Sequence, residues 1–516
     1  MAVKKVKKKK RKIRSGSGAS KATMRPRHIE KTPPCRHRCP SGNRVREFVT
    51  TLAQAEHLGK SLDQAFEEAW ETVTETSPFP AVCGRVCPHP CEIVCNRKDL
   101  DTAVNINEIE RAIGDFGLEK GLKLKALSDA PQQEQVAVVG AGPGGLSCAY
   151  QLARRGYPVT VYEASEKPGG LLRYGIPSFR LPEAVLDGEI QKILDLGVEL
   201  KCDTRIGDGT SLDDLRSQYQ AVFVSIGAER GMKLGVAGEE AENVVSGVDL
   251  LGRINRGEQV DVGDKVVVVG GDNRALDAAR ACRRLGAEVT VVFGDTLEKM
   301  PAMKELVQGA QEEGLTLECL VAAVGFKKDG DRVTGVECVR MELGEPDGAG
   351  NRQPVTIVGS QFEIPVTAVV PGIGQEPNNA GFESLVNGSV WIQADKYGAS
   401  ERADDVFAGG DAIGLGYVTT AIGQGRQAAE SIDLKLRGLP REEEPLPPMI
   451  LWEDDRMGLR LDGYEEKARA RADTLAVGDR LSGMDAEVRL PMSSEQVVEE
   501  SSRCMSCGFC SDCEKC

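Results

Sequence analysis

Two strand–glycine turn–helix units are the feature that most constrains how this chain of 516 residues can fold. The first begins at Val136 and the second at Lys265, and around both of them short Val-rich strands alternate with helical segments. This alternation is typical of a parallel sheet with crossover helices. Because the units are about 130 residues apart, we expect an α/β fold of two nested Rossmann-type nucleotide-binding domains, with 261–364 inserted between 131–260 and 365–440.

The first unit carries a glycine fingerprint for a dinucleotide. Its strand runs into Gly140-Ala-Gly142-Pro-Gly144-Gly145, and a helix follows. Gly140 permits the tight turn, Gly142 lets the backbone approach a pyrophosphate, and Gly145 lets helix and strand pack closely. The free N–H groups of the helix N-terminus would face the phosphates. Glu163 ends the next strand, where a carboxylate can bind an adenosine ribose.

Three later segments favour FAD as the ligand of this first site. A Gly-rich stretch with Gly170 and Arg173 would bring backbone close to a large flat ligand. Gly410 and Asp411 follow a strand, and an Asp there can accept a hydrogen bond from a ribityl hydroxyl. Thr420 opens a helix whose positive end could stabilise a reduced, anionic flavin.

The second unit predicts a nicotinamide nucleotide site through Gly270, Gly271 and Asn273. Asp272 stands where the second fingerprint glycine belongs, and a carboxylate there repels a pyrophosphate. A working site and a vestigial one therefore both stay open. Asp295 follows the next strand with no arginine for a 2′-phosphate, so we predict that NADH is preferred over NADPH.

Cysteines near the start of the chain stand at metal-ligand spacing. Cys87, Cys91 and Cys95 are four residues apart, and Cys39 is the expected fourth ligand. Four thiolates usually hold a 4Fe–4S cluster, and zinc can use four cysteines as well. Iron–sulfur is favoured because zinc cannot pass electrons to a neighbouring flavin. The surrounding apolar residues recur at helical spacing, so we predict a helical 4Fe–4S domain over 31–130.

Five cysteines at Cys-x-x-Cys spacing close the chain: Cys504, Cys507, Cys510, Cys513 and Cys516. The last three match the start of a ferredoxin run, whose fourth ligand would come beyond the last residue. Three alternatives stay open for these cysteines. Either they are the ligands of a third cluster, or the chain is a truncated form of a longer protein, or a partner or another residue completes the site. The weakly periodic segment 441–516 is expected to wrap over the surface and carry these cysteines back to the body.

Charge and hydropathy exclude several classes of function. The net charge of −14 argues against nucleic acid as the main partner. No apolar run is long enough to span a membrane, and the basic N-terminus is not a secretory signal. We therefore expect a cytoplasmic protein, where cysteines favour metal over disulfides. The first residues, 1–30, are expected to be a disordered basic tail or, alternatively, a docking arm for an acidic partner protein.

Together these motifs resemble the family of the glutamate synthase small subunit and its relatives, from Thr32 to Leu436. The residues that carry the resemblance are Cys39-Pro40, Phe79-Pro80, the runs 84–88 and 90–92, the run 140–145, the run 169–177 and Gly410-Asp411. The resemblance implies an adrenodoxin-reductase-like pair of Rossmann domains behind a helical domain with two 4Fe–4S clusters.

The resemblance also implies how the cluster ligands are shared. The ligands implied for one cluster are Cys39, Cys87, Cys91 and Cys95. The other would use Cys35, Glu110 and a Cys-x-x-Cys just before Cys35. No such pair precedes Cys35, so we expect Cys504 and Cys507 to return from the C-terminus in its place. This arrangement is similar to iron–sulfur flavoproteins that work beside dissimilatory sulfite reductase in sulfur bacteria.

The expected function is an NAD(P)H-dependent oxidoreductase that contains FAD and 4Fe–4S clusters. Hydride would pass between nicotinamide and flavin. Single electrons would travel through the clusters to or from a partner redox protein or larger catalytic subunit. This chemistry requires no general acid or base from the protein. Two alternatives are a glutamate synthase small subunit and a non-catalytic electron-wiring module whose nicotinamide site has decayed. A homo-oligomer also stays open.

Overall fold

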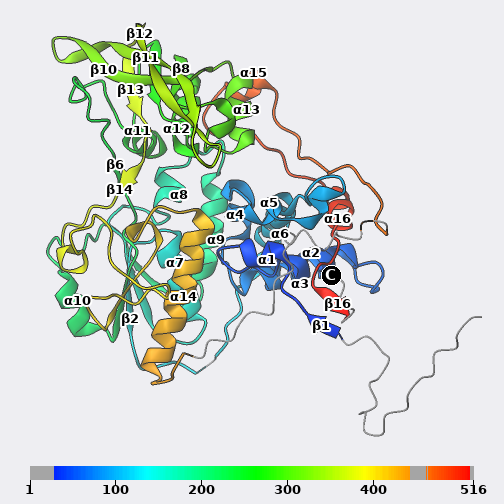
Figure 1. Cartoon of the computed structure of the whole chain (residues 1–516). Coiled ribbons are helices and arrows are strands. Elements are labelled where there is room, and N and C mark those ends of the chain that lie inside the picture. Colours follow the sequence, from blue (N-terminus) through cyan, green and yellow to red (C-terminus); the bar gives the residue numbers. More distant parts are fainter. Residues whose placement is uncertain (1–27, 129, 442–460, 462, 512–516) are drawn as a thin grey trace, which may run out of the picture.

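The computed structural model describes residues 28–128, 130–441, 461 and 463–511. Figure 1 shows a helical region in blue, an α/β unit in cyan, yellow and orange beside it, and a second α/β unit in green. The predicted fold class, two nested Rossmann-type units with an N-terminal helical domain, is confirmed. Within the described residues, no helix is both long and apolar enough to cross a membrane.

The helical region consists of α1 (Pro34–Arg38), α2 (Val45–Ala53), α3 (Leu62–Thr74), α4 (Pro80–Val86), α5 (Pro90–Ile93), the 3₁₀ turn η1 (Asn96–Asp99) and α6 (Ile106–Glu119). Two glycines let α4 and α6 pack closely. A Cβ on Gly84 would lie 2.3 Å from the Cα of Arg111, and one on Gly114 would lie 2.1 Å from the backbone nitrogen of Ala81. This contact brings the end of α4, where Cys87 lies, to the helix that carries Glu110.

The first α/β unit contains a parallel sheet in the order β15 (Val406–Ala408), β5 (Ala221–Val224), β2 (Val136–Val139), β3 (Val159–Tyr162) and β4 (Glu199–Lys201). One face packs against α7 (Pro143–Ala153), α9 (Glu183–Leu194), α14 (Val418–Leu436) and the helical region. The other packs against α10 (Leu212–Gln218). Strand β2 is apolar throughout because both its faces are buried.

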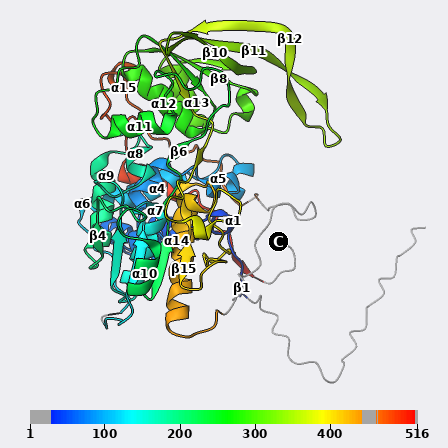
Figure 2. The ribbon, with the colours of Figure 1, turned by 90° about the vertical axis from the view of Figure 1, so that its left-hand side faces the viewer.

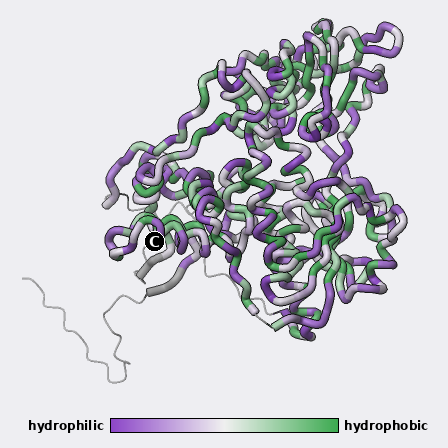
Figure 3. The backbone as a smooth tube through the Cα atoms, turned by 180° about the vertical axis from the view of Figure 1, so that it is seen from behind, coloured by the Kyte–Doolittle hydropathy of each residue, from purple (hydrophilic) through white to green (hydrophobic). Residues whose placement is uncertain are grey.

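The second unit contains a parallel sheet in the order β13 (Ala368–Pro371), β7 (Lys265–Val269), β8 (Glu288–Phe293) and β9 (Thr316–Cys319). One face shares its core with α11 (Gly247–Asn255), α12 (Asn273–Arg284) and α13 (Lys304–Glu312). The other is covered by the antiparallel strands β10 (Val321–Asp329), β11 (Arg332–Pro346) and β12 (Arg352–Pro365). Figure 2 shows the β11–β12 hairpin reaching beyond the body of this unit, and the outer loops there are hydrophilic (Figure 3).

The strand pairing corrects the two predicted boundaries of the inserted domain. Strand β13 and helix α11 fall in segments assigned to the first unit by sequence, but both belong to the second. An apolar strand can be recognised from its residues, whereas the sheet in which it pairs depends on tertiary structure. The two crossings between the units lie side by side as an antiparallel pair, β6 (Arg230–Gly231) and β14 (Gln375–Glu376).

The C-terminal segment contacts the helical region at 467–470, reaches the second unit at α15 and then returns to the helical region, in orange and red in Figure 1. It contains α15 (Val477–Arg480), α16 (Ser494–Ser501) and β16 (Phe509–Ser511). Helix α16 packs against α2 and α6, and β16 pairs with β1 (His28–Glu30). Residues 28–30 were predicted to belong to a disordered tail; they form a strand because β16 supplies its hydrogen-bonding partner. Residues 1–27 lie outside the described residues.

Candidate functional site

A cleft of about 950 Å³ lies between the two α/β units and reaches the helical region through Val86 and Pro88. A volume of this size is at the upper end for ligand sites in proteins and suits a large cofactor. The cofactor residues predicted from sequence that line it are Gly140, Gly142, Gly144, Glu163, Gly170, Asn273, Gly410 and Asp411. Those outside its lining are Gly145, Arg173, Gly270, Gly271, Asp295 and Thr420.

The first glycine turn has the geometry expected of a pyrophosphate cradle. Gly140 has a φ of 100°, and a Cβ there would lie 2.3 Å from the carbonyl oxygen of Ser225. A Cβ on Gly145 would lie 1.9 Å from the carbonyl oxygen of Gly140, so this residue serves close packing. A Cβ on Gly142 would meet nothing within 4 Å. The backbone at Gly142 is therefore open to the cleft.

Glu163 at the end of β3 holds this turn in place. Its carboxylate accepts hydrogen bonds from the backbone N–H groups of Ala141 and Ser165, both at 2.8 Å. Each carboxylate oxygen keeps a second lone pair, and Glu163 lines the cleft. The residue can therefore support the turn and still bind a ribose hydroxyl.

Arg173 differs from its predicted role as a cofactor-binding residue. Its buried guanidinium donates to the carbonyl oxygen of Pro168 at 2.6 Å, to Glu183 at 2.7 Å and to Asp187. These contacts brace the Gly-rich loop from outside the cleft. Gly170, in contrast, has a φ of 54°, and a Cβ there would lie 3.0 Å from the Cα of Gly142. The Gly-rich loop thus brings its backbone close to the first glycine turn at Gly170, whereas Arg173 takes no part in the cleft.

The first turn of α14 separates the cleft from the first cysteines. Val418 and Ala421 line the cleft, while the Thr419 hydroxyl lies 3.8 Å from the Sγ of Cys87. Thr420 points its backbone N–H to the carbonyl oxygen of Tyr417, at 2.9 Å. Asp411, just before this helix, accepts from Gly416 N–H at 3.0 Å, and burial raises the pKa of its carboxyl.

At the second glycine turn, Asp272 occupies the N-cap position of α12. Its carboxylate accepts the backbone N–H of Ala275 at 2.8 Å, and the Nε of Arg274 lies 3.4 Å from it. The acid thus takes an amide that a pyrophosphate would otherwise use, and Arg274 partly offsets its charge. Gly270 has a φ of 143°, and a Cβ on Gly271 would lie 2.5 Å from the ring of Phe293. Both glycines are required by the turn itself.

Two other predicted residues of the second site also serve the local backbone. Asn273 lines the cleft, and its side-chain oxygen accepts the N–H of Met303 at 2.8 Å. Asp295 accepts the N–H of Thr296 at 2.8 Å, and its other oxygen lies 3.6 Å from the Nζ of Lys299. Asp295 stays at the end of β8, where the nucleotide-selecting acid was predicted.

The cysteines form two groups. In the first, burial raises the pKa of the Cys87 thiol, and the nearby Glu110 and Cys39 raise it further. Burial also raises the pKa of Cys91, and Glu92, Cys87 and Cys39 add to this effect. We assign Cys39, Cys87, Cys91 and Glu110 to the first group; Cys83 also lies near Glu110 and Cys87, and Cys35 also acts on Cys91. Burial raises the pKa of Glu110 to about 8, against the effect of the amide of Asn43, which donates to it at 3.0 Å.

The second group combines cysteines from near both ends of the chain. Burial raises the pKa of Cys35, and the neighbouring Cys504, Cys95 and Cys507 raise it further. A small cavity between these four thiols is otherwise lined by apolar side chains such as that of Val49. The structure thus places Cys504 and Cys507 beside Cys35, where the sequence prediction put them.

The grouping corrects two ligands that the resemblance implied. Cys95 lies with the second group and Glu110 with the first, the reverse of the expectation. Helix α5 ends at Ile93, and Cys95 has extended backbone beyond it, so Cys91 and Cys95 do not share one helix face. The strand that contains Cys510 is described, but its side chain is not; Cys513 and Cys516 lie outside the described residues.

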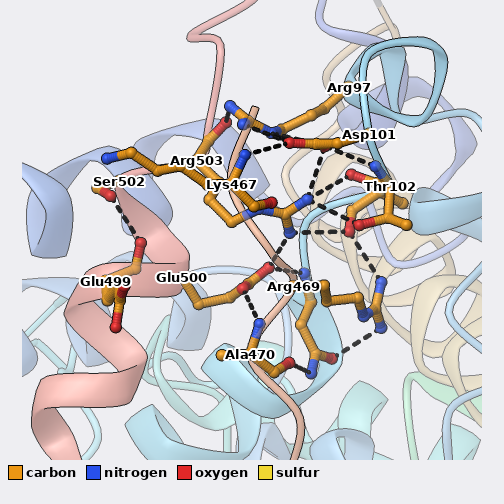
Figure 4. A network of polar contacts seen from close by, with 12 residues as sticks. Arg97, Asp101, Thr102, Lys467, Arg469, Ala470, Glu499, Glu500, Ser502 and Arg503 are labelled. Atoms are coloured by element: carbon orange, nitrogen blue, oxygen red, sulfur yellow. Dashed lines mark hydrogen bonds and ion pairs between the residues drawn. The ribbon is translucent and has the colours of Figure 1, made fainter. Parts of the chain in front are cut away.

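A buried ionic network fixes the returning segment, as Figure 4 shows. Arg503, at 1% exposure, donates to Glu500 at 2.5 Å and to Asp101 at 2.8 Å. Arg97 donates to the carbonyl oxygen of Arg503 at 2.6 Å. Cys504 directly follows this anchored residue, so the network determines where the last cysteines lie.

Both groups fit iron–sulfur clusters by their chemistry. All the cysteines for which the structure describes a side chain are free thiols, and thiolates are the ligands such clusters take. Within the described part of the chain, no three candidate ligands lie close enough to hold one metal ion.

Comparison with known proteins identifies the family. Residues 134–425 match the family model for pyridine nucleotide-disulphide oxidoreductases. The chain belongs to this family. Residues 4–122 of the oxidoreductase match the model described as dihydropyrimidine dehydrogenase domain II, 4Fe-4S cluster. The predicted FAD and NAD(P) sites and the iron–sulfur domain are thereby confirmed as classes of site.

Relatives of this oxidoreductase agree with the resemblance seen in its motifs. The NADPH-Fe(3+) oxidoreductase subunit beta of Geobacter sulfurreducens is 36% identical and aligns with 93% of this chain and 76% of that protein. The glutamate synthase (NADPH) small chain of Escherichia coli is 35% identical, over 78% of this chain and 88% of its own. FprA of Mycobacterium tuberculosis, solved with NADPH, has a TM-score of 0.52 at 16% identity over 72% of this chain and all of its own, and shows the fold alone.

Sequence reasoning missed several charged residues that line the cleft of this oxidoreductase, among them Arg180, Arg274 and Asp277. Arg180 comes from the first unit and pairs with the buried Asp277 of α12 in the second. Arg274 follows Asn273 within the glycine turn, so its position next to the motif was a signal that could have identified it. The Arg180–Asp277 pair has no local signal, because its partners are 97 residues apart.

Proposed function

We propose that this oxidoreductase moves electrons between NAD(P)H and a redox partner protein or larger catalytic subunit, with FAD in the cleft. The first group of ligands would hold one 4Fe–4S cluster and the second group another. FAD, when bound, supplies the exchange between two-electron hydride chemistry and single electrons. The cytoplasmic location expected from sequence stays a prediction.

The observation that carries this proposal is the short connection between the cleft and the first group. Val86 and Pro88, on either side of Cys87, line the cleft. The Thr419 hydroxyl, 3.8 Å from the Sγ of Cys87, belongs to the turn that lines the cleft from the other side. The first group therefore lies against the cleft wall, and no separate element has to connect the two sites.

Residues of the cleft would bind and orient the cofactors. The open backbone at Gly142 would accept the pyrophosphate of FAD, Glu163 its adenosine ribose, and Asp411 a ribityl hydroxyl. In the second unit, Arg274 would bind a phosphate of the nicotinamide nucleotide and offset Asp272.

We infer a preference for NADH from Asp295. A carboxylate at the end of the second strand bonds a free ribose hydroxyl and repels a 2′-phosphate. The relatives named above are NADPH proteins, so the two cofactors need direct comparison. We expect Asp295→Asn to raise kcat/KM for NADPH relative to that for NADH, whereas a wild-type preference for NADPH would contradict the inference.

The test of the proposed function is anaerobic reduction of the purified protein. NADH should bleach the flavin absorbance, and a one-electron acceptor should restore it. Cys87→Ser should leave flavin bleaching intact and slow electron delivery to the acceptor, because the first group lies against the cleft. Equal delivery by Cys87→Ser and wild type would contradict the proposal.

Asp272 favours one alternative, an electron-wiring module without nicotinamide chemistry. Its carboxylate caps α12 where a pyrophosphate would bind. Bleaching by dithionite but by neither NADH nor NADPH would support that alternative. The other, a glutamate synthase small subunit, fits the relatives equally well, and copurification with a glutamate-forming large subunit would support it.

A further inference from the structure

Helix α1 contains or adjoins one cysteine of each group, and the residues between these two cysteines are basic. Cys35 is within α1 and Cys39 directly follows it, and the side chains between them are Arg36, His37 and Arg38. His37 and Arg38 are exposed and Arg36 is half-buried. The first turn of α1 contains no acid. In the described parts of the chain, neither arginine takes part in an ion pair.

An exposed apolar side chain accompanies these charges. Helix α5 contacts α1, and its Ile93 is 67% exposed. Lys98, also exposed, donates from its Nζ to the carbonyl oxygen of Ile93 at 2.9 Å. We call these five residues, Arg36, His37, Arg38, Ile93 and Lys98, the α1 patch. An apolar centre with charged neighbours is the usual composition of a protein–protein contact surface.

Both cysteine groups approach the surface near this patch. Cys504 and Cys507 are partly buried, and Cys87 and Cys91 are buried. The partly buried cysteines in or next to the elements of the patch are Cys35 and Cys95 of the second group and Cys39 of the first. Single-electron exchange between proteins needs a short path, so a partner gains most by binding where the ligand groups are least covered. The α1 patch is built on the elements that carry these three cysteines.

We propose that the α1 patch is the docking surface for an acidic one-electron carrier protein. The inference deepens the proposed function and rests on it, because it assigns the chemistry of the partner. The chain as a whole carries a net charge of −14, so a basic patch runs against the average charge. Such a patch attracts an acidic protein to one orientation and raises its association rate.

The experiment uses charge reversal with a matched control. The double variant Arg36→Glu and Arg38→Glu is compared with Arg332→Glu and Arg402→Glu, two exposed arginines on the α/β units. Both double variants change net charge equally. The probes are an acidic plant-type ferredoxin, basic cytochrome c and uncharged benzoquinone, with the protein reduced either by NADH or by dithionite.

We expect the α1 double variant to lower kcat/KM for ferredoxin roughly tenfold or more at low salt, with little effect on benzoquinone. The dissociation constant of ferredoxin, measured on the oxidised protein, should rise with it, and the salt dependence should weaken. The control pair should leave both values near wild type.

Three outcomes would overturn the inference: unchanged ferredoxin binding, an equal loss in the control pair, or a preference for cytochrome c in the wild type. Self-association that the α1 variant abolishes, without an effect on ferredoxin, would instead assign the patch to a second copy of this chain. If NADH fails to reduce the flavin, the nicotinamide part of the proposed function fails. Ferredoxin binding and the dithionite reaction still decide on the α1 patch.

Discussion

The two cysteine groups are assembled in opposite ways. The first draws Cys39, Cys87, Cys91 and Glu110 from one helical region, and close glycine contacts between α4 and α6 bring its parts together. The second joins residues from near both ends of the chain: Cys504 and Cys507 reach Cys35 because Arg503 bonds Asp101, 402 residues away in sequence, α16 packs against α2 and α6, and β16 pairs with β1. We conclude that the first group is a property of a local fold, whereas the second depends on long-range contacts, among which Arg503 lies nearest to its cysteines.

The largest expected effect is the loss of one cluster when a ligand of its group is replaced. Cys504→Ser should remove the second cluster, lowering iron content by about half while FAD content stays unchanged, since four thiolates are normally required. Cys87→Ser should lower iron equally but affect the first cluster. Iron analysis and low-temperature electron paramagnetic resonance of the reduced proteins measure both.

The matched control is Cys282→Ala, which removes a fully buried thiol of the second α/β unit. It should keep the full iron content. If Cys504→Ser retained all its iron, the second group would not be a ligand set, and the comparison between local and long-range assembly would fail.

The next effect concerns the anchor alone. Arg503→Met leaves the buried Glu500 without its arginine, which costs about 3–5 kcal/mol when a buried pair is broken, whereas the half-buried Asp101 keeps its pair with Arg97. We expect the C-terminal segment to detach, protease sites in 463–508 to open, and the second cluster to be lost while the first remains. Arg503→Lys should restore part of the protection. Simultaneous loss of both clusters would show that the groups are not independent.

The first glycine turn shows what the sequence could predict. Strand, turn, helix and acid follow one another within about thirty residues, and local backbone geometry requires Gly140 and Gly145, so Gly140, Gly142 and Glu163 lie where they were expected. Arg173 shows the limit. Its place in a glycine-rich loop indicated a ligand, but Glu183 and Asp187, ten and fourteen residues later, bind its guanidinium instead.

The cysteines show the same limit at larger scale. Spacing alone predicted that Cys87, Cys91 and Cys95 belong together, because they recur every four residues. The helix between them ends at Ile93, and that local stop sends Cys95 to the other group. The return of Cys504 was predictable only because a ligand pair was missing before Cys35. The sheet membership of β13 had no local signal, because strand pairing is decided by contacts between distant segments.

A smaller effect tests how the first group is joined to the α/β body. Glu189 of α9 accepts the N–H groups of Ala81 and Val82, at 2.7 and 3.0 Å, at the start of the helix that leads to Cys87. Burial raises the pKa of Glu189 from 4.5 to about 8. Because the folded state holds a proton that the unfolded chain has lost, this contribution to stability is fully present below pH 4.5 and falls as the pH rises to about 8.

Glu189→Gln should remove that pH dependence. The measurement is the urea midpoint of unfolding at about pH 5 and about pH 8; the wild type should lose stability between them, and the variant should lose less, because Glu110, whose pKa is also raised to about 8, still contributes. The control Glu67→Gln changes an exposed carboxyl of α3 and should follow the wild type. A variant with the wild-type slope would assign the pH dependence to another group.

The smallest effect should be confined to the first group. Asn43 donates to Glu110 at 3.0 Å, and its side-chain oxygen accepts from Ser41 at 3.1 Å and Thr76 at 2.7 Å. Asn43→Ala leaves the buried carboxylate without this donor, at a cost of about 1–3 kcal/mol. We expect the reduction potential of the first cluster to shift, because hydrogen bonds to ligands tune such clusters, while that of the second stays constant. Thr76→Val, which keeps the bond from Asn43 to Glu110, should shift neither. A potentiometric titration that moved both clusters together would mean that they are one coupled assembly, despite their separate origins in the chain.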